Sequence, residues 1–195
     1  MRDITFHDHA DHLRALIYAS PWLMQALYAA RELNLSEWCI GAGAVRNLVW
    51  DVAHGWEPLP HQHSDIDLCY FNAGDIRPER DTALQIMLQQ KLPAFKWEVV
   101  NQAGVHSWFA DYFGYAIPPF TNLSAAVASW PETATAVAVW LDENDGLHII
   151  APHGLTDLFD LWVRPSPGCN PAAYRARVEA KQYALRWPKV RQVPV

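Results

Sequence analysis

Residues 41–71 read GAGAVRNLVWDVAHGWEPLPHQHSDIDLCYF, and this stretch decides the expected fold. It follows a short apolar run, 37–40, and opens on a Gly-Ala-Gly turn. Apolar residues then recur at helical spacing over 43–53, and a second apolar run, 65–71, carries two aspartates. The pattern predicts a strand, a turn, a helix, a loop and a strand. Packing alone gives no reason for the aspartates in the second strand.

The paired aspartates are Asp65 and Asp67. Alternate residues of a strand share a face, so both side chains point the same way, with Cα atoms roughly 6.6 Å apart. Two carboxylates at this spacing repel each other unless a cation lies beside them, and Mg²⁺ takes carboxylate oxygens together with substrate phosphates. The pair therefore fits a phosphoryl- or nucleotidyl-transfer site. The alternative is a solvated strand face, which Asp-x-Asp alone does not exclude.

The turn before the helix consists of small residues only: Gly41, Ala42, Gly43 and Ala44. It places backbone amides and the positive end of a helix at the end of a strand, which favours an anion. The sequence lacks the third glycine of a dinucleotide-binding turn and the Gly-Lys-Ser/Thr of a Walker loop. Arg46 suits a phosphate ligand by charge and geometry. The alternative is a plain tight turn that lets strand and helix pack closely.

The turn, followed about twenty residues later by a strand with Asp-x-Asp, resembles the nucleotidyltransferases of the DNA polymerase beta superfamily. Over about residues 20–188 the chain is similar to a family of bacterial nucleotidyltransferase-like proteins. The strings that carry this resemblance are GAGAVRNLVWD, SDIDLCYF, WEVVNQAGVH, WPETATAVAV and APHGLTDLFDLWVRP. The resemblance implies an α+β (mixed α/β) chain with the minimal nucleotidyltransferase fold, in which helices flank a small mixed sheet.

The resemblance also implies roles for particular residues. Asp65 and Asp67 would hold Mg²⁺ or Mn²⁺, with Glu98 on the next expected strand as the third carboxylate. The turn would bind the triphosphate of a nucleoside triphosphate. Members of the superfamily often carry a serine in this turn, and this chain has no hydroxyl there, so Arg46 and Asn47 are expected to supply the missing contacts.

Three further residues follow Glu98 in the string NQAGVH: Asn101, Gln102 and His106. They are candidates for contacts to a base, a sugar or the acceptor. The alternative for Asn101 and Gln102 is that they satisfy backbone groups at a strand end. His61 and His63 precede the aspartates and allow a transition-metal cluster, although loop histidines are the simpler interpretation.

The expected reaction transfers a nucleoside monophosphate to an unknown acceptor with release of pyrophosphate. A second hypothesis is a catalytically inactive module that binds a nucleotide or a metal for regulation. A third is an interaction protein that uses a tryptophan-rich surface, since the chain has ten tryptophans. The third hypothesis predicts no dependence on divalent metal.

Composition limits the classes further. The chain has 195 residues, 51% of them apolar and 18% charged, which predicts one folded domain over 1–195. The net charge of −6 disfavours long nucleic acid as a partner. Residues 170–195 nevertheless hold six basic residues and one acid, which allows contact with a phosphate-bearing ligand, a solvated face or docking on the acidic remainder.

No run reaches membrane-spanning length, no signal peptide is apparent, and no Cys-x-x-Cys pair occurs, so a cytoplasmic protein is expected. The periodicity predicts N-terminal helices over about 9–33, helices over 78–91, 103–114 and within 118–130, and a basic C-terminal helix over about 171–187. It predicts a strand over 96–102 and a hairpin from 133–141 and 147–152. Residues 154–165 fit a helix or a strand.

Overall fold

The computed structural model describes residues 8–59 and 65–194. Its main sheet has five strands in the order β3-β2-β1-β4-β5. Their bounds are β1 (Trp38–Gly41), β2 (Ile66–Tyr70), β3 (Trp97–Asn101), β4 (Ala138–Leu141) and β5 (Leu147–Ile150). The β2–β3 pair is parallel and the other three pairs are antiparallel. The expected mixed sheet flanked by helices is confirmed.

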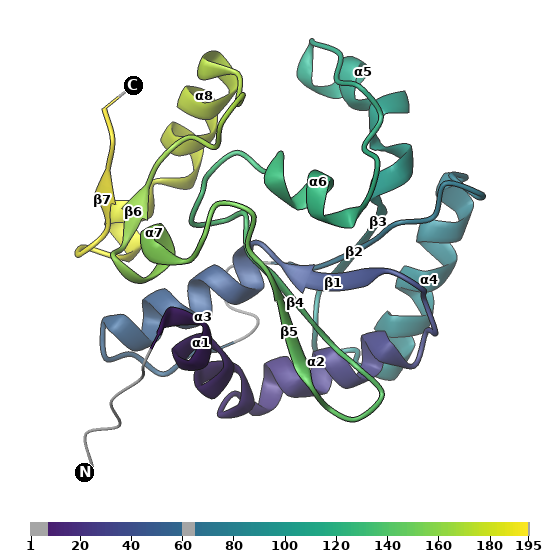
Figure 1. Ribbon diagram of the computed structural model, residues 1–195, viewed down its shortest axis with the longest axis horizontal. Helices are drawn as coiled ribbons and strands as arrows, with labels where there is room; N and C mark the ends of the chain where they lie inside the picture. The colour runs from purple at the N-terminus through teal and green to yellow at the C-terminus, as the bar shows by residue number, and fades with distance from the viewer. Residues whose placement is uncertain (1–7, 60–64, 195) are drawn as a thin grey trace.

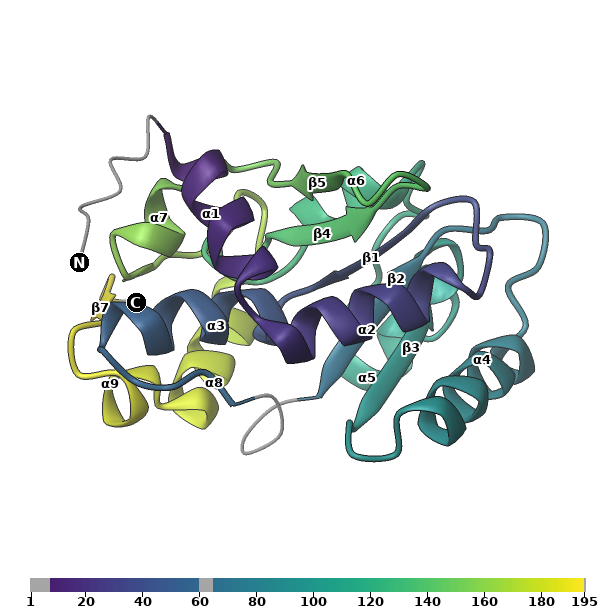
Figure 2. The same ribbon diagram turned by 90° about the horizontal axis from the view of Figure 1, so that it is seen from below.

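The helices form layers on both faces of this sheet (Figures 1 and 2). One face is covered by α1 (His9–Tyr18), α2 (Pro21–Arg31), α3 (Gly43–Ala53) and α4 (Pro78–Lys91). The other face carries α6 (Leu123–Ala128), with η1 (Gln102–Ser107) and α5 (Phe109–Phe113) beyond it. Beside α3 lie α7 (Thr156–Phe159), α8 (Pro171–Lys181), α9 (Tyr183–Arg186) and a small sheet of β6 (Trp162–Val163) and β7 (Arg191–Gln192).

Strand alternation divides the core in two. The larger part packs Ile40, Ile66 and Leu68 against the apolar stripes of α1 to α4. The smaller part packs Cys39 and Cys69, which are direct register partners with free thiols, against α6. Asp67 lies between Ile66 and Leu68 in the strand, so its side chain points to the α6 face.

Three helix starts show ordinary first-turn and capping chemistry. Pro21 and Pro78 occupy the first turns of α2 and α4, where the missing amide costs nothing. Asn170 caps α8, because its Oδ1 accepts from the amides of Ala172 and Ala173. Among the described residues, no helix combines the length and the apolar character that crossing a membrane requires.

The structure corrects several expected boundaries. The helix expected over 103–114 is a 3₁₀ helix followed by α5, which ends at left-handed Gly114. The strand expected from residue 133 begins only at Ala138, because a turn holds the amides of Thr135 and Ala136 on the carbonyl of Glu132.

Further differences from the expected elements lie towards the C-terminus. The helix expected over 171–187 breaks at Gln182, whose φ of 47° ends α8 and begins α9. Residues 154–165 contain both α7 and β6. The pairing of β6 with β7 was not expected, since a two-residue strand carries no periodicity.

Gly41 ends β1 where three parts of the chain meet. It pairs with Asp67 on one side and with Ala138 on the other. A Cβ atom on Gly41 would lie 2.7 Å from the Cβ of Ala138 and 2.8 Å from the ring of Trp130. Carbon atoms do not approach that closely, so the absence of a side chain lets β1 pass beside the Trp130 ring.

We therefore expect Gly41→Ala to lower the free energy of unfolding by about 1–3 kcal/mol, the usual cost of overpacking a core. Urea unfolding followed by tryptophan fluorescence measures this. Gly74→Ala is the matched control, because the nearest atom to its Cβ is the side-chain oxygen of Asn72 at 3.3 Å. A Gly41→Ala variant as stable as the wild type would contradict the close packing at this turn.

Candidate active site

Asp67 and Glu98 stand next to each other on neighbouring strands. They are register partners in the parallel β2–β3 pair and share the face that carries α6. Asp65 lies one residue before β2 rather than inside it, and its carboxylate pairs with Lys96 Nζ at 2.6 Å. The sheet thus brings the three predicted carboxylates to the start of two adjacent strands.

The negative charge of Asp67 is poorly compensated. Burial is the main cause that raises its pKa from 3.8 to about 7, and the charges of Glu98 and Asp65 add to the effect. Arg46 and Arg177 act in the opposite direction. The pKa of this carboxyl group therefore lies near neutral pH, and a cation beside it would lower that pKa and favour the ionised form.

The Gly-Ala-Gly turn joins β1 to α3 beside these carboxylates. Ala42 has φ 50° and ψ −120°, a conformation that L-residues rarely adopt and that costs on the order of 1–3 kcal/mol. Its amide donates to the carbonyl of Val137 at 3.1 Å. The amide of Ala42 is therefore engaged by protein, and those of Gly43 and Ala44 open the first turn of α3, where helical geometry leaves amides without intrahelical acceptors.

Arg46 is buried rather than exposed to a ligand, with 4% of its surface accessible. Its Nη1 donates to Thr135 Oγ1 at 2.8 Å and to the Tyr183 hydroxyl at 3.4 Å, and its Nη2 donates to Asn47 Oδ1 at 2.9 Å. The guanidinium also lies over the rings of Trp50 and Tyr183. Arg46 thus contributes positive potential from inside the protein.

Glu132 is a buried acid within 132–135, a string that the sequence pattern predicts to enter a strand or to line the acceptor site, with no separate role for the acid. It is 1% exposed, and its Oε1 accepts from Arg177 Nε at 2.6 Å and from the Tyr183 hydroxyl at 3.1 Å. Its Oε2 has no hydrogen-bond partner among the described residues. In the sequence, the acid in the string WPETA and the basic C-terminal helix were the two features that could have suggested an ion pair between these segments.

A family model described as nucleotidyltransferase matches residues 28–192. This chain belongs to the nucleotidyltransferase family. A search of curated proteins finds no match.

Solved structures agree with this assignment for the fold. The nucleotidyltransferase is similar to a protein solved by NMR and described as a CCA-adding enzyme head domain, with 26% identity, a TM-score of 0.82 and 98% of each chain covered. It is also similar to the Thermotoga maritima CCA-adding enzyme complexed with tRNA, with 14% identity and a TM-score of 0.58. That match covers 94% of this chain and 42% of the enzyme chain. The fold is therefore of the polymerase beta type.

The donor chemistry of the nucleotidyltransferase fits a divalent cation. Asp65, Asp67 and Glu98 offer only oxygen ligands, which Mg²⁺ and Mn²⁺ accept. Within 8–59 and 65–194, no three such side chains converge closely enough to hold an ion as they stand. Asp65 pairs with Lys96. His61 and His63 lie outside the described residues.

The remaining predicted residues lie at the other end of β3. Asn101 follows Glu98 by three residues, which is roughly 10 Å along a strand. Its Nδ2 donates to the carbonyls of Asn72 and Asp75, and its Oδ1 accepts from the amides of Asn72 and Ala103. These bonds match the alternative of backbone satisfaction at a strand end.

Gln102 and His106 belong to η1, which continues from that end of β3. Gln102 is 6% exposed and donates to the carbonyl of Val100 at 3.4 Å. The buried Nδ1 of His106 has no partner in the part of the chain that the structure describes. The structure does not bring these two residues together with the carboxylates.

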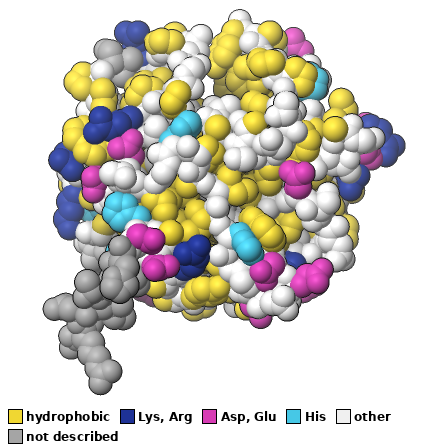
Figure 3. All heavy atoms as spheres, in the orientation of Figure 1, with side chains coloured by type: hydrophobic (Ala, Val, Ile, Leu, Met, Phe, Trp, Pro, Cys, Tyr) yellow, Lys and Arg dark blue, Asp and Glu magenta, His cyan; other side chains and the backbone are white. Residues whose placement is uncertain are grey.

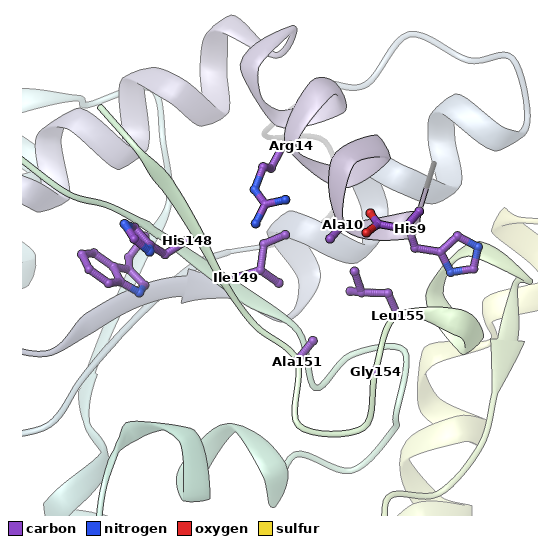
Figure 4. Close-up of a pocket in the computed structure, with 10 residues that line it drawn as sticks. His9, Ala10, Arg14, His148, Ile149, Ala151, Gly154 and Leu155 are labelled. Atoms are coloured by element: carbon purple, nitrogen blue, oxygen red, sulfur yellow. The ribbon is translucent and has the colours of Figure 1, made fainter. Parts of the chain in front are cut away.

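The nucleotidyltransferase also has an open hollow of about 760 Å³ between α1 and β5 (Figure 4). Its polar lining includes His9, Arg14 and His148. In the sheet order, β1 and β4 lie between β5 and β2. The hollow is therefore separate from the carboxylates.

We expect the stability of the metal-free protein to fall as pH rises through about 7. The folded pKa of Asp67 lies above its unfolded value, so the folded state binds the extra proton between about pH 4 and 7. Asp67→Asn removes this dependence, and its free energy of unfolding should exceed that of the wild type by about 1 kcal/mol or more at pH 8. Urea unfolding in EDTA from pH 5 to 8.5 tests this.

Asp111→Asn, on α5, serves as the control for that series and should keep the wild-type pH profile. The interpretation of Asp67 is contradicted by a wild-type stability that stays flat across neutral pH, or by an Asp67→Asn profile parallel to that of the wild type.

We further expect Asn101→Ala to lower the free energy of unfolding by about 2–3 kcal/mol, because it leaves the amides and carbonyls of the 72–75 loop without their partner. Thermal unfolding measures the loss. Nucleotide binding by the folded variant should match the wild type. A stable Asn101→Ala protein with weakened nucleotide binding would assign this residue to the ligand instead.

Proposed function

We propose that this protein transfers a nucleoside monophosphate from a nucleoside triphosphate to an acceptor hydroxyl or phosphate and releases pyrophosphate. Asp65, Asp67 and Glu98 would hold Mg²⁺ or Mn²⁺. The amides of Gly43 and Ala44 would bind the triphosphate. Family membership supports the reaction type, and the residues named here are proposed from their placement.

One observation carries the proposal. Asp67 and Glu98 are partners across parallel strands, and Gly41, the register partner of Asp67, leads directly into the N-terminus of α3. Carboxylates that attract cations and amides that attract phosphates therefore stand at one place. A metal–triphosphate complex satisfies both.

The chemistry follows from this placement. Bound Mg²⁺ would neutralise the triphosphate and lower the pKa of the acceptor hydroxyl. Glu98 accepts the acceptor proton while the acceptor oxygen forms its bond to the α-phosphorus. The bond from the α-phosphorus to the bridging oxygen breaks, and its electron pair leaves with pyrophosphate. The first-turn amides of α3 hold the phosphates in line, so positioning and electrostatics supply most of the catalysis.

The acceptor is open to test. The Thermotoga maritima enzyme was solved with tRNA, which makes an RNA end one candidate. The net charge of −6 points instead to a small acceptor or to limited contact with a longer one. On the face shown in Figure 3, lysine and arginine side chains lie mainly near two edges, with hydrophobic and acidic side chains between them.

A second candidate function is nucleotide binding without transfer. Two observations favour it: the amide of Ala42 donates to Val137, and the guanidinium of Arg46 is held by Thr135, Asn47 and Tyr183. Two of the phosphate contacts expected from the sequence are thus occupied by protein. Such a module would bind a nucleoside triphosphate and release no pyrophosphate.

We expect thermal unfolding of the wild type to shift upwards with one or more of the four ribonucleoside triphosphates when Mg²⁺ or Mn²⁺ is present. A ligand at 100 times its Kd stabilises the folded state by about 2.7 kcal/mol. Asp67→Asn and Glu98→Gln should lose the metal-dependent part of this shift, while Asp111→Asn keeps it. Pyrophosphate release is then measured with the bound triphosphate and a panel of small hydroxyl compounds and RNA ends.

The outcomes separate the hypotheses. A metal-dependent shift with pyrophosphate release supports transfer. The same shift without release across the whole panel supports the regulatory module. An identical shift in the wild type and Asp67→Asn removes the carboxylates from the binding site and overturns the proposal.

A further inference from the structure

The basic C-terminal helix lies beside the candidate site, and its contacts point into the buried network around Glu132. Arg177 on α8 donates to Glu132, Tyr183 donates to the same oxygen, and Arg46 donates to Tyr183. This chain of contacts connects α8 to the first turns of α3 (Figure 2). The helix is therefore fixed against the turn that carries the proposed phosphate amides.

Arg177 and Lys181 occupy one side of α8. They are four residues apart, which places their Cβ atoms roughly 6 Å from each other on a helix. The neighbouring side, with Tyr174 and Val178, is buried and sets the rotation of the helix. The side chain of Arg177 remains 32% exposed although Glu132 holds its Nε.

Three basic side chains lie near one another in this region, and only Arg177 has an ion-pair partner among the described residues. Arg46 and Arg177 lie close enough for their charges to act on Lys181, and so do the acids Asp67 and Glu132. Lys181 forms no ion pair with any residue that the structure describes. Burial and the two arginines lower its pKa. An anion bound between these bases would reduce their mutual repulsion.

The anion must also suit the carboxylates. The charge of Asp67 acts on Lys181, and those of Arg46 and Arg177 act on Asp67, so these acids and bases lie close to one another. A bare carboxylate ligand would be repelled by Asp67 and Glu98. A polyphosphate that carries a divalent cation meets both requirements, because its metal faces the acids and its distal oxygens face the bases.

We propose that Arg177 and Lys181 bind the β- and γ-phosphates of the nucleoside triphosphate, and that buried Glu132 orients Arg177 for this contact. The inference rests on the proposed function and names a phosphate-binding side of the same site. Arg177 gains directional hydrogen bonds to phosphate oxygens, and Lys181 acts as a point charge. Glu132 is a positioning residue, since it touches Arg177 and not the ligand.

The test is isothermal titration calorimetry of the full chain with Mg²⁺, using ATP, AMP and inorganic tripolyphosphate as probes. Arg177→Gln and Lys181→Gln should each weaken ATP and tripolyphosphate binding by about tenfold or more, the range of a lost charge-assisted contact. AMP binding should change less than about threefold, because AMP lacks the distal phosphates. Arg175→Gln, an exposed residue of the same helix, is the matched control and should leave all three affinities unchanged.

Glu132 is tested by a double-mutant cycle. Glu132→Gln should weaken tripolyphosphate binding in the wild-type background and have no further effect in Arg177→Gln. Arg177→Lys should restore part of the affinity. Circular dichroism tests whether each variant is folded. A purely structural role for Arg177 would weaken ATP and AMP binding alike, whereas a contact to the distal phosphates lowers the ratio of ATP to AMP affinity.

Each result bears on one of the two proposals. Equal ATP binding by the wild type, Arg177→Gln and Lys181→Gln overturns the phosphate-binding role and leaves the proposed function standing. Tripolyphosphate binding that depends on these residues, with none of the four ribonucleoside triphosphates bound, overturns nucleotidyl transfer and leaves Arg177 and Lys181 as a site for a polyphosphate that is not a nucleotide. A wild type that binds no probe overturns both.

Discussion

The close approach at Gly41 is the constraint on which the rest of the structure depends. The residue has no side chain, so β1 can pair with β2 and β4 while the Trp130 ring lies against its end. The chain then turns through the strained Ala42 into α3 at the level of Asp67. A bulkier residue would separate the strand from Trp130 and move the helix N-terminus away from the carboxylates. The same atom-level contact thus sets both the packing and the position of the site.

Charge balance is the second organising feature. The start of the β2–β3 pair concentrates carboxylates, while α8 and the first turn of α3 contribute the cations Arg177 and Arg46. The carboxylates are not fully neutralised by protein partners, since burial and the charges of Glu98 and Asp65 raise the pKa of Asp67 to about 7. Incompletely compensated charges of this kind are typical of ligand-binding sites, where the ligand supplies the missing partners. This is the physical content of the proposed site.

Much of the fold was predictable from the sequence. The strand, turn and helix around Gly41 and the alternation at Asp67 carry strong periodicity and turn chemistry, and they were confirmed together with the mixed sheet. Asn101 shows the limit, because a strand-end amide looks the same in sequence whether it binds a ligand or its own backbone. Glu132 and the small second sheet depend on contacts between residues far apart in the chain, which no local pattern reports. Arg46 was predicted to bind phosphate, but its guanidinium is buried against aromatic rings. One of these rings is Tyr183 of α9, which lies over a hundred residues later in the chain, so the local sequence does not reveal the burial.

The facing cysteines beside the site have a consequence for how the protein can be observed. Cys39 and Cys69 are buried across the β1–β2 pair, and burial, with the nearby charge of Asp67, raises the pKa of both thiols. Thiolates are the reactive species, so the closed sheet protects both sulfurs from alkylating reagents. Their labelling rate therefore reports how often β1 and β2 separate in the native ensemble. Because Cys69 is two residues from Asp67 and Cys39 is the register partner of Cys69, this labelling rate measures local opening of the sheet next to the candidate site.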